Sequence, residues 1–298
     1  SLEVSSAHGS TVSGMAASNG LANGTNKGFA PEADLIVVES DFSQDVYNWK
    51  LSIADACDYI FKVADSLNKP AVINLSLGDY YGTHDATDPA AELINSLLDE
   101  KEGRIVVSAA GNSGDYGPYH VGTDVTSDTS FVWSIPNPSS TIINNVNDVV
   151  IFDFVVDTSE ANFSYAISSC NPNNQYERTG STTFLPFSSG FTTGIPEFEN
   201  IENENGDLIA VAFIYRETFG SNIIGQIAVT GPGFTPIDSS EYVFGFETFG
   251  SGHYDLWGGN FSGRSNFVIE VPDSATLPEI VHYITPDTLQ TIVDSWNC

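Results

Sequence analysis

The stretch V-I-N-L-S-L-G at Val72–Gly78 decides the fold, together with the later stretch V-V-S-A-A-G-N-S-G at Val106–Gly114. Each begins as a short apolar run, which is typical of a strand buried on both faces of a parallel sheet. A helical pattern separates them, with Thr87 or Asp88 able to cap its start and Gly103 ending it. Its apolar stripe consists of Leu93, Ile94, Leu97 and Leu98. The order strand, helix, strand predicts a βαβ unit.

The same alternation of strand and helix patterns extends over residues 1–115. We predict strands at Ala33–Glu39, Ala71–Leu77 and Arg104–Ala109, and a small-residue-rich helix over His8–Asn19. A further helix before the second strand is indicated by apolar residues at spacings of three and four, namely Ile53, Cys57, Ile60, Phe61, Ala64 and Leu67. The alternation predicts an α/β fold, in which helices flank a parallel sheet and the crossovers are right-handed.

The periodicity of apolar residues changes at about Ser130, where the helical spacing ends and short β-rich runs begin. These runs are Val149–Val156, Asn162–Ile167, Leu208–Tyr215, Ile223–Val229, Tyr242–Thr248 and Phe267–Val271. Clusters of Gly, Pro, Asn and Ser separate them, which predicts an all-β sandwich or jelly roll. The tail Pro286–Trp296 returns to a helix-like pattern.

The composition is strongly acidic, with 9 basic and 39 acidic residues among 298 and a net charge of −30. This charge argues against nucleic acid and against anionic membrane surfaces as partners. No apolar run approaches the roughly 18–20 residues of a membrane span, and we expect a secreted or cell-surface protein. The densest acidic stretch, Glu197–Asp207, is broken by Asn and Gly and predicts a loop.

The three cysteines, Cys57, Cys170 and Cys298, have no metal-ligand spacing. Cys57 falls on the apolar face of a predicted helix and is expected in the core. The sequence does not decide whether Cys170 and Cys298 form a disulfide. We predict no cofactor; a structural calcium held by loop Asp and Asn residues also stays open, although no EF-hand-like string supports it.

The motif A-H-G-S-T-V-S-G-M-A-A at Ala7–Ala17, with the two strand-end stretches, resembles the middle of a subtilisin-like serine protease (peptidase family S8). His8-Gly9 and Gly14 match the family pattern H-G-T-x-V-A-G, and the resemblance implies that His8 is the general base. We expect Gly9 and Gly14 to allow close approach of neighbouring elements. The stretch Gly28–Leu35 resembles the family's G-V-A-P-x-A-x-L, which leads into a strand.

The resemblance also implies substrate-binding residues. Ser76, Leu77 and Gly78 would line the non-primed groove and pair their backbone with an extended peptide. Asn112 would donate its side-chain amide to the oxyanion. The small residues that would form one wall of the pocket for the side chain before the scissile bond are Ala109, Ala110 and Gly111.

Two members of the family's triad are missing from the sequence. The family's Asp precedes the His in a D-T/S-G context, and residues 1–7 contain no Asp. The nucleophile lies in G-T-S-M-A, and residues 113–298 contain no such string. We therefore predict a fragment of a secreted serine endopeptidase that is inactive alone, with Asp and Ser outside it. Alternatives are a non-catalytic binding module on a degenerate scaffold, or a chain whose triad is completed by partner chains.

The resemblance divides the chain into a partial catalytic domain (1–128), an inserted β-sandwich (129–282) and a truncated return to the catalytic domain (283–298). The insertion would brace the core, select protein substrates beside the cleft, or bind glycans through aromatics such as Tyr254 and Trp257. The partial sheet leaves backbone groups and apolar side chains without neighbouring strands, which predicts self-association or a partner chain. The expected ligand is a peptide or protein substrate.

Overall fold

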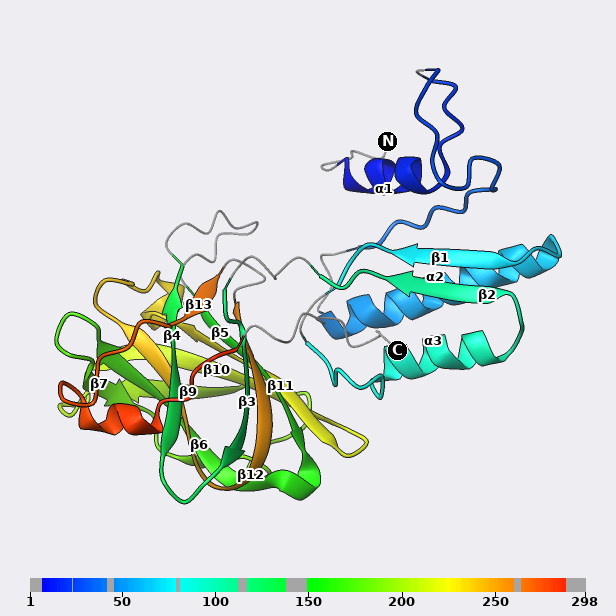
Figure 1. The fold of residues 1–298 in the computed structure, drawn as a ribbon. Helices are drawn as coiled ribbons and strands as arrows, with labels where there is room; N and C mark the ends of the chain where they lie inside the picture. The colour runs from blue at the N-terminus through cyan, green and yellow to red at the C-terminus, as the bar shows by residue number, and fades with distance from the viewer. Residues whose placement is uncertain are drawn as a thin grey trace. The chain divides into compact units, whose positions relative to one another are not determined.

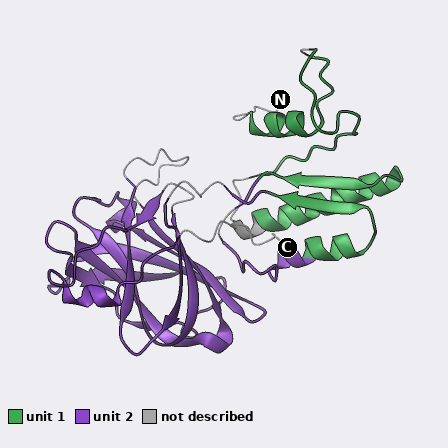
Figure 2. Cartoon of the chain, in the orientation of Figure 1, with its two compact units in different colours: residues 1–76, 93–108 green, residues 77–92, 109–298 purple. Residues whose placement is uncertain are grey.

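The structure is a computed structural model, which describes residues 7–22, 24–41, 46–78, 81–111, 117–137, 149–259 and 264–287. Its contacts divide the chain into two compact units (Figure 2). Unit 1 comprises residues 1–76 and 93–108, and unit 2 comprises residues 77–92 and 109–298. The domain boundaries predicted after residues 128 and 282 are not tested by this division and remain predictions.

Unit 1 is built from helices and a small parallel sheet (Figure 1). Its elements are α1 (His8–Ala17), α2 (Val46–Ser66), β1 (Ala71–Leu75), β2 (Arg104–Ser108) and most of α3 (Pro89–Asp99), whose first residues belong to unit 2. Strands β1 and β2 pair in parallel, with Leu75 opposite Ser108. Because parallel neighbours need a crossover connection, α3 lies between them in sequence.

Local sequence accounts for these helices. Several buried residues of α2 follow the helical spacing of three and four, among them Ile53, Cys57, Phe61 and Ala64. Asp88 caps α3, since its Oδ1 accepts from the backbone N–H groups of Ala90 and Ala91, both at 3.0 Å. Gly103 adopts a φ of 86° directly before β2, a conformation that favours glycine.

The predicted α/β class is wrong for the molecule as a whole. In the described part of the structure, strands make up 39% and helices 20%, so its fold is mainly β. Within the described residues, the parallel sheet has two strands, β1 and β2. The expected strand Ala33–Glu39 has no regular structure, and its residues Leu35, Val37 and Val38 are exposed. An apolar run does not by itself form a strand, and none of the described strands pairs with this segment.

Unit 2 is an antiparallel β structure. Its strands are β3 (His120–Val125), β4 (Ser130–Pro136), β5 (Val150–Asp157), β6 (Ala161–Asn171), β7 (Glu177–Ser181), β8 (Leu185–Pro186), β9 (Glu197–Glu202), β10 (Leu208–Phe219), β11 (Asn222–Thr230), β12 (Val243–Gly258) and β13 (Ser265–Phe267). Short 3-10 turns include η2 (Thr158–Glu160), η3 (Pro232–Phe234) and η5 (Pro278–His282).

Seven of the described strands close into a barrel, in the order β12-β5-β11-β10-β9-β7-β6 and back to β12 (Figure 1). The predicted sandwich or jelly roll is therefore wrong. Strands with alternating apolar and polar residues occur in sandwiches and in barrels alike. Here the sheet closes because β6 pairs over a long stretch with β12, which is far from it in sequence. Strands β3, β4 and β13 extend the sheet beside β12.

Strand β12 turns a corner that makes closure possible. Its first part pairs with β6 up to Gly252, and its last residues pair with β3 and β5. At the corner, Gly250 and Gly252 have φ values of 135° and 145°. A Cβ at Gly252 would lie 1.5 Å from the carbonyl oxygen of Glu160, so this position cannot hold a side chain without a shift of the backbone.

The barrel interior is a packed core of aromatic and branched side chains. Its members include Phe152, Phe154, Phe163, Tyr165, Ile167, Phe187, Ile214, Ile227, Phe244, Phe246, Tyr254 and Leu256. Many of the rings contact one another, as Tyr165 and Phe246 do at 5.8 Å between centroids. Each aromatic ring buries a large apolar area, so these contacts stabilise the barrel.

The chain enters and leaves the antiparallel β structure of unit 2 at adjacent positions. The backbone N–H of Asp287 donates to the carbonyl of His120 at 2.8 Å, and that of Tyr119 donates to the carbonyl of Asp287 at 3.2 Å. Both nitrogens of the buried His120 ring face carboxylates, Nε2 that of Asp255 at 2.9 Å and Nδ1 that of Asp287 at 3.2 Å. The helix predicted over Pro286–Trp296 lies outside the described residues from residue 288 onward.

Candidate active site

His8 is the first residue of α1, and its side chain is exposed. Its Nε2 lies 3.0 Å from the carbonyl oxygen of Ser76, the residue that follows β1. The structure thus brings the candidate base into contact with the candidate substrate-binding segment. A carbonyl can only accept, so Nε2 carries the proton in this pair.

The segment Ser76–Gly78 continues from the carboxyl end of β1. Ser76 and Leu77 are half-buried and Gly78 is exposed, and the Asn74 side chain donates to the Ser76 hydroxyl at 2.9 Å. In open parallel sheets, ligands bind outside the carboxyl ends of the strands. The segment therefore lies where this architecture places binding residues.

The second candidate segment continues from the carboxyl end of β2. Ala109 is half-buried, Ala110 and Gly111 are exposed, and Gly111 has a φ of 89°. Because Leu75 pairs with Ser108, both candidate segments begin at the same edge of the sheet. Asn112 lies outside the described residues, so its predicted role at the oxyanion stays a prediction.

The close contacts expected at Gly9 and Gly14 are not present. Apart from the adjacent residues and the backbone of α1 itself, no heavy atom in the described part of the chain lies within 4 Å of a Cβ placed at either glycine. The tight position is Gly28, where a Cβ would lie 2.6 Å from the backbone nitrogen of Ala17. Gly28 packs against the end of α1 and donates its N–H to Ser18 at 2.8 Å, so the Gly28–Leu35 stretch supports the helix that begins with His8.

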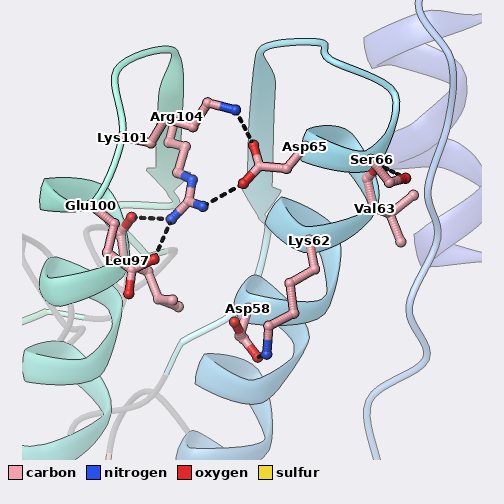
Figure 3. A network of polar contacts seen from close by, with 9 residues as sticks. All are labelled: Asp58, Lys62, Val63, Asp65, Ser66, Leu97, Glu100, Lys101 and Arg104. Carbon is pink, nitrogen blue, oxygen red and sulfur yellow. Dashed lines mark hydrogen bonds and ion pairs between the residues drawn. The ribbon is translucent and has the colours of Figure 1, made fainter.

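Arg104 joins β2, which leads into the second candidate segment, to helices α2 and α3 (Figure 3). Its guanidinium donates to Asp65 of α2 at 2.8 Å, to Glu100 at 3.0 Å and to the carbonyl of Leu97 at 2.6 Å. Hydrogen bonds from Lys101 and then from Arg104 lower the pKa of Asp65. A cavity of about 190 Å³ adjoins this network. It is lined by the starting residues of β1 and β2 and so lies at the other end of the strands from Ser76.

The aromatic residues considered for glycan binding are buried. Tyr254 is inside the barrel and Trp257 is covered on its outer wall, so neither presents a ring face to a glycan. The described residues hold no group of three His, Cys, Asp or Glu side chains arranged for a metal ion. None of the helices in the described ranges is both long and apolar enough to cross a bilayer.

Sequence reasoning missed the contacts that residues 81–88 make with the barrel wall. The Tyr81 hydroxyl donates to Glu217 at 2.8 Å, and the Asn222 side chain donates to Asp85 at 3.0 Å. These partners are separated by 136 and 137 positions. No motif or periodicity in the sequence relates them.

Comparison with known proteins agrees with the motifs. The model of the subtilase family, peptidase family S8, matches residues 1–189, which is more than half of the chain. No curated protein matches. The fold is similar to that of the Clostridium perfringens CspB protease, with a TM-score of 0.59 and 17% identity, over 96% of this chain and 57% of that chain. The chain thus spans little more than half the length of that protease. We conclude that the chain belongs to the subtilase family of serine proteases.

Proposed function

We propose that the chain is part of a secreted serine endopeptidase, which cleaves peptide or protein substrates through an acyl-enzyme. The observation that carries this proposal is the 3.0 Å contact between His8 Nε2 and the Ser76 carbonyl. It joins the family's base motif to the family's substrate-pairing motif, and the two occur in family order along the chain.

His8 would take the hydroxyl proton of a serine during attack on the substrate carbonyl. For this, Nε2 must accept a proton, whereas against the Ser76 carbonyl it donates one. An Asp that accepts from Nδ1–H fixes the tautomer in which Nε2 is free to act as a base, and its loss costs about 10⁴ in kcat. We place this Asp and the nucleophilic Ser outside residues 1–298, since neither family motif occurs within them.

The oxyanion would be held by Asn112. Removing one such donor costs about 3 kcal/mol of transition-state stabilisation, or roughly 10²-fold in kcat. Residues 1–298 alone have neither the nucleophile string nor the family's Asp, and we propose that they do not hydrolyse peptides.

A fluorophosphonate probe tests the proposal, because it labels only an activated serine. The full-length protein should be labelled, and residues 1–298 alone should not. His8→Ala should abolish labelling of the full-length protein, and Asn112→Ala should lower peptide turnover about 10²-fold. His282→Ala is the matched control, since His282 is also exposed but lies in η5 of unit 2, and it should leave labelling unchanged.

Absence of labelling in the full-length protein would instead support a binding module on a degenerate protease scaffold. That alternative rests on the same missing Asp and Ser motifs. It predicts that His8→Ala changes neither labelling nor turnover.

We also propose that residues 1–298 self-associate, or bind a partner chain, through the sheet of unit 1. One face of the sheet exposes Val72, Ile105 and Val107 at 68%, 52% and 49%. Among the described strands, none pairs with the outer edges of β1 and β2, and exposed apolar side chains beside such edges favour association. Sedimentation should show concentration-dependent dimers that Val72→Lys with Val107→Lys disrupts; a monomer at all concentrations argues against the proposal.

A further inference from the structure

Residues 81–88, which we call the strap, lie in sequence between the Ser76–Gly78 segment and helix α3. The strap has no regular secondary structure, yet Tyr81, Thr83 and Asp88 are buried. It belongs to the same compact unit as the barrel. A segment without secondary structure is normally exposed, so this burial calls for specific partners on the barrel wall.

The first partner is Glu217 of β10. One of its carboxylate oxygens accepts from the Tyr81 hydroxyl at 2.8 Å, and the other accepts from the Tyr215 hydroxyl at 2.6 Å. Burial, followed by the charge of Glu217, raises the pKa of Tyr81 far above its usual range. The Tyr81 hydroxyl therefore stays protonated and remains the donor. Hydrogen bonds to a charged acceptor are stronger than those between neutral groups.

The second partner is Asn222 at the start of β11. Its Nδ2 donates to Asp85 Oδ2 at 3.0 Å, while Asp85 Oδ1 accepts from the backbone N–H of Thr87 at 3.0 Å and from its hydroxyl at 2.6 Å. The ring of His84 stacks on Trp257 of β12, with centroids 4.0 Å apart and planes within 5°. The strap is thus attached to three strands, β10, β11 and β12.

The backbone of the strap is held in an unfavourable conformation. His84 and Ala86 have φ values of 56° and 64°, in the left-handed region that residues other than glycine seldom adopt. Such conformations persist where the surroundings determine them, and they concentrate at functional sites. In the strap, the contacts with the barrel stabilise these backbone conformations of His84 and Ala86.

We propose that Glu217 and Asn222 are positioning residues for the protease reaction: through the strap they hold Leu77 and Gly78 extended for pairing with the substrate backbone. The inference rests on the proposed function. Gly78 lies three residues before Tyr81, so anchoring Tyr81 confines it to within about 11 Å of the anchor. A segment held in its binding conformation before the substrate arrives loses less entropy on binding. The barrel thereby acts on substrate affinity rather than on the chemical step.

The test compares variants of the full-length protein that remove one polar contact each. Tyr81→Phe and Asn222→Ala, singly and combined, remove the hydrogen bonds that join the strap to Glu217 and Asn222. Tyr215→Phe and Asn162→Ala are matched controls, since they remove a hydrogen bond to the same Glu217 and an Asn–Ser251 bond, both within the barrel. Hydrogen–deuterium exchange of residues 77–88 and the KM and kcat for a peptide substrate are measured for each.

The combined variant should exchange residues 77–88 at least about tenfold faster and raise KM about five- to tenfold, with kcat changed less than twofold. The controls should stay within about twofold of the wild type. Unchanged exchange, faster exchange with an unchanged KM, or equal effects in the controls each overturn the inference. A wild-type protein that neither reacts with a fluorophosphonate nor turns over peptide is a different result, because it rejects the proposed function itself.

Discussion

Arg104 donates a 2.8 Å hydrogen bond to Asp65 and thereby joins the first residue of β2 to the last turn of α2. The same guanidinium reaches Glu100 and the Leu97 carbonyl of α3, and it lies 4.8 Å from the ring centre of Phe61. One side chain therefore connects both helices to the sheet, although the chain has only nine basic residues.

Arg104→Ala should lower the thermal unfolding midpoint by about 5 °C, because the loss leaves Asp65 and the Leu97 carbonyl without this donor. Arg104→Lys should recover only part of the loss, since Lys lacks the planar fork that reaches several acceptors. Lys62→Ala is the control. Lys62 pairs with Asp58 on the exposed side of α2, and its removal should shift the midpoint by about 1 °C or less. Equal shifts for Arg104 and Lys62 would contradict the role assigned to Arg104.

Gly252→Ala should destabilise the barrel by about 3 kcal/mol or more, since its Cβ would overlap the Glu160 carbonyl at the corner of β12. Gly206→Ala is the control, because it introduces a Cβ at a positive φ without any steric overlap. Gly206 has a φ of 80° with open space around it, and its substitution should cost about 1 kcal/mol. Chemical denaturation measures both, and similar losses for the two variants would show that the β12 corner is not tightly packed.

Attachment of the strap should weaken in acid. Burial opposes ionisation of Asp85, but hydrogen bonds from Thr87 and Asn222 prevail and lower its pKa. A lowered pKa in the folded state contributes stability that is complete above the unfolded value of about 4 and is lost as the pH falls further. Exchange of residues 81–88, corrected for the intrinsic rate, should therefore accelerate below about pH 4.

Asp85→Asn provides the reference for this pH dependence, because the protein carries 39 acidic residues that also titrate in acid. Only the difference between wild type and variant reports on Asp85. This difference should be constant above about pH 5 and shrink as the pH falls below about 4. A difference that does not vary with pH would exclude Asp85 as the titrating group.

Cys57 and Cys170 should be unreactive in the folded protein. Cys57 is 1% exposed on α2, and burial raises its pKa to about 11. Burial likewise raises the pKa of Cys170 in β6 to about 12. In a Cys298→Ser variant at pH 8, iodoacetamide should modify both at least about 100-fold more slowly than after unfolding. Modification within minutes, with circular dichroism unchanged, would contradict the described packing.

Local sequence signals predicted the local structure well. The apolar spacing of α2 and the Asp88-Pro89 start of α3 each depend on residues within a few turns, and both elements occur where expected. The prediction of a loop over Glu197–Asp207 was wrong for its first half, because contacts with distant residues decide the structure there. Its first half is strand β9, because Ile201 enters the barrel core and Glu197 pairs with the buried Arg216. Composition alone cannot reveal such partners.

The candidate site was only partly predictable. Motif order suggested that His8 and Ser76 belong to one site, and they lie in contact, although their catalytic roles stay predictions. Barrel closure and the strap depend on pairings between distant residues, such as Tyr81 with Glu217. Alternation and charge constrain which residues are inside or outside, but they do not specify which distant segments meet.

The backbone hydrogen bonds that Asp287 makes with Tyr119 and His120 have an evolutionary consequence. Since the antiparallel β structure of unit 2 starts and finishes at neighbouring backbone positions, its gene segment can behave as a cassette. One recombination event can place such a cassette in a surface loop of a protease without pulling the loop's ends apart.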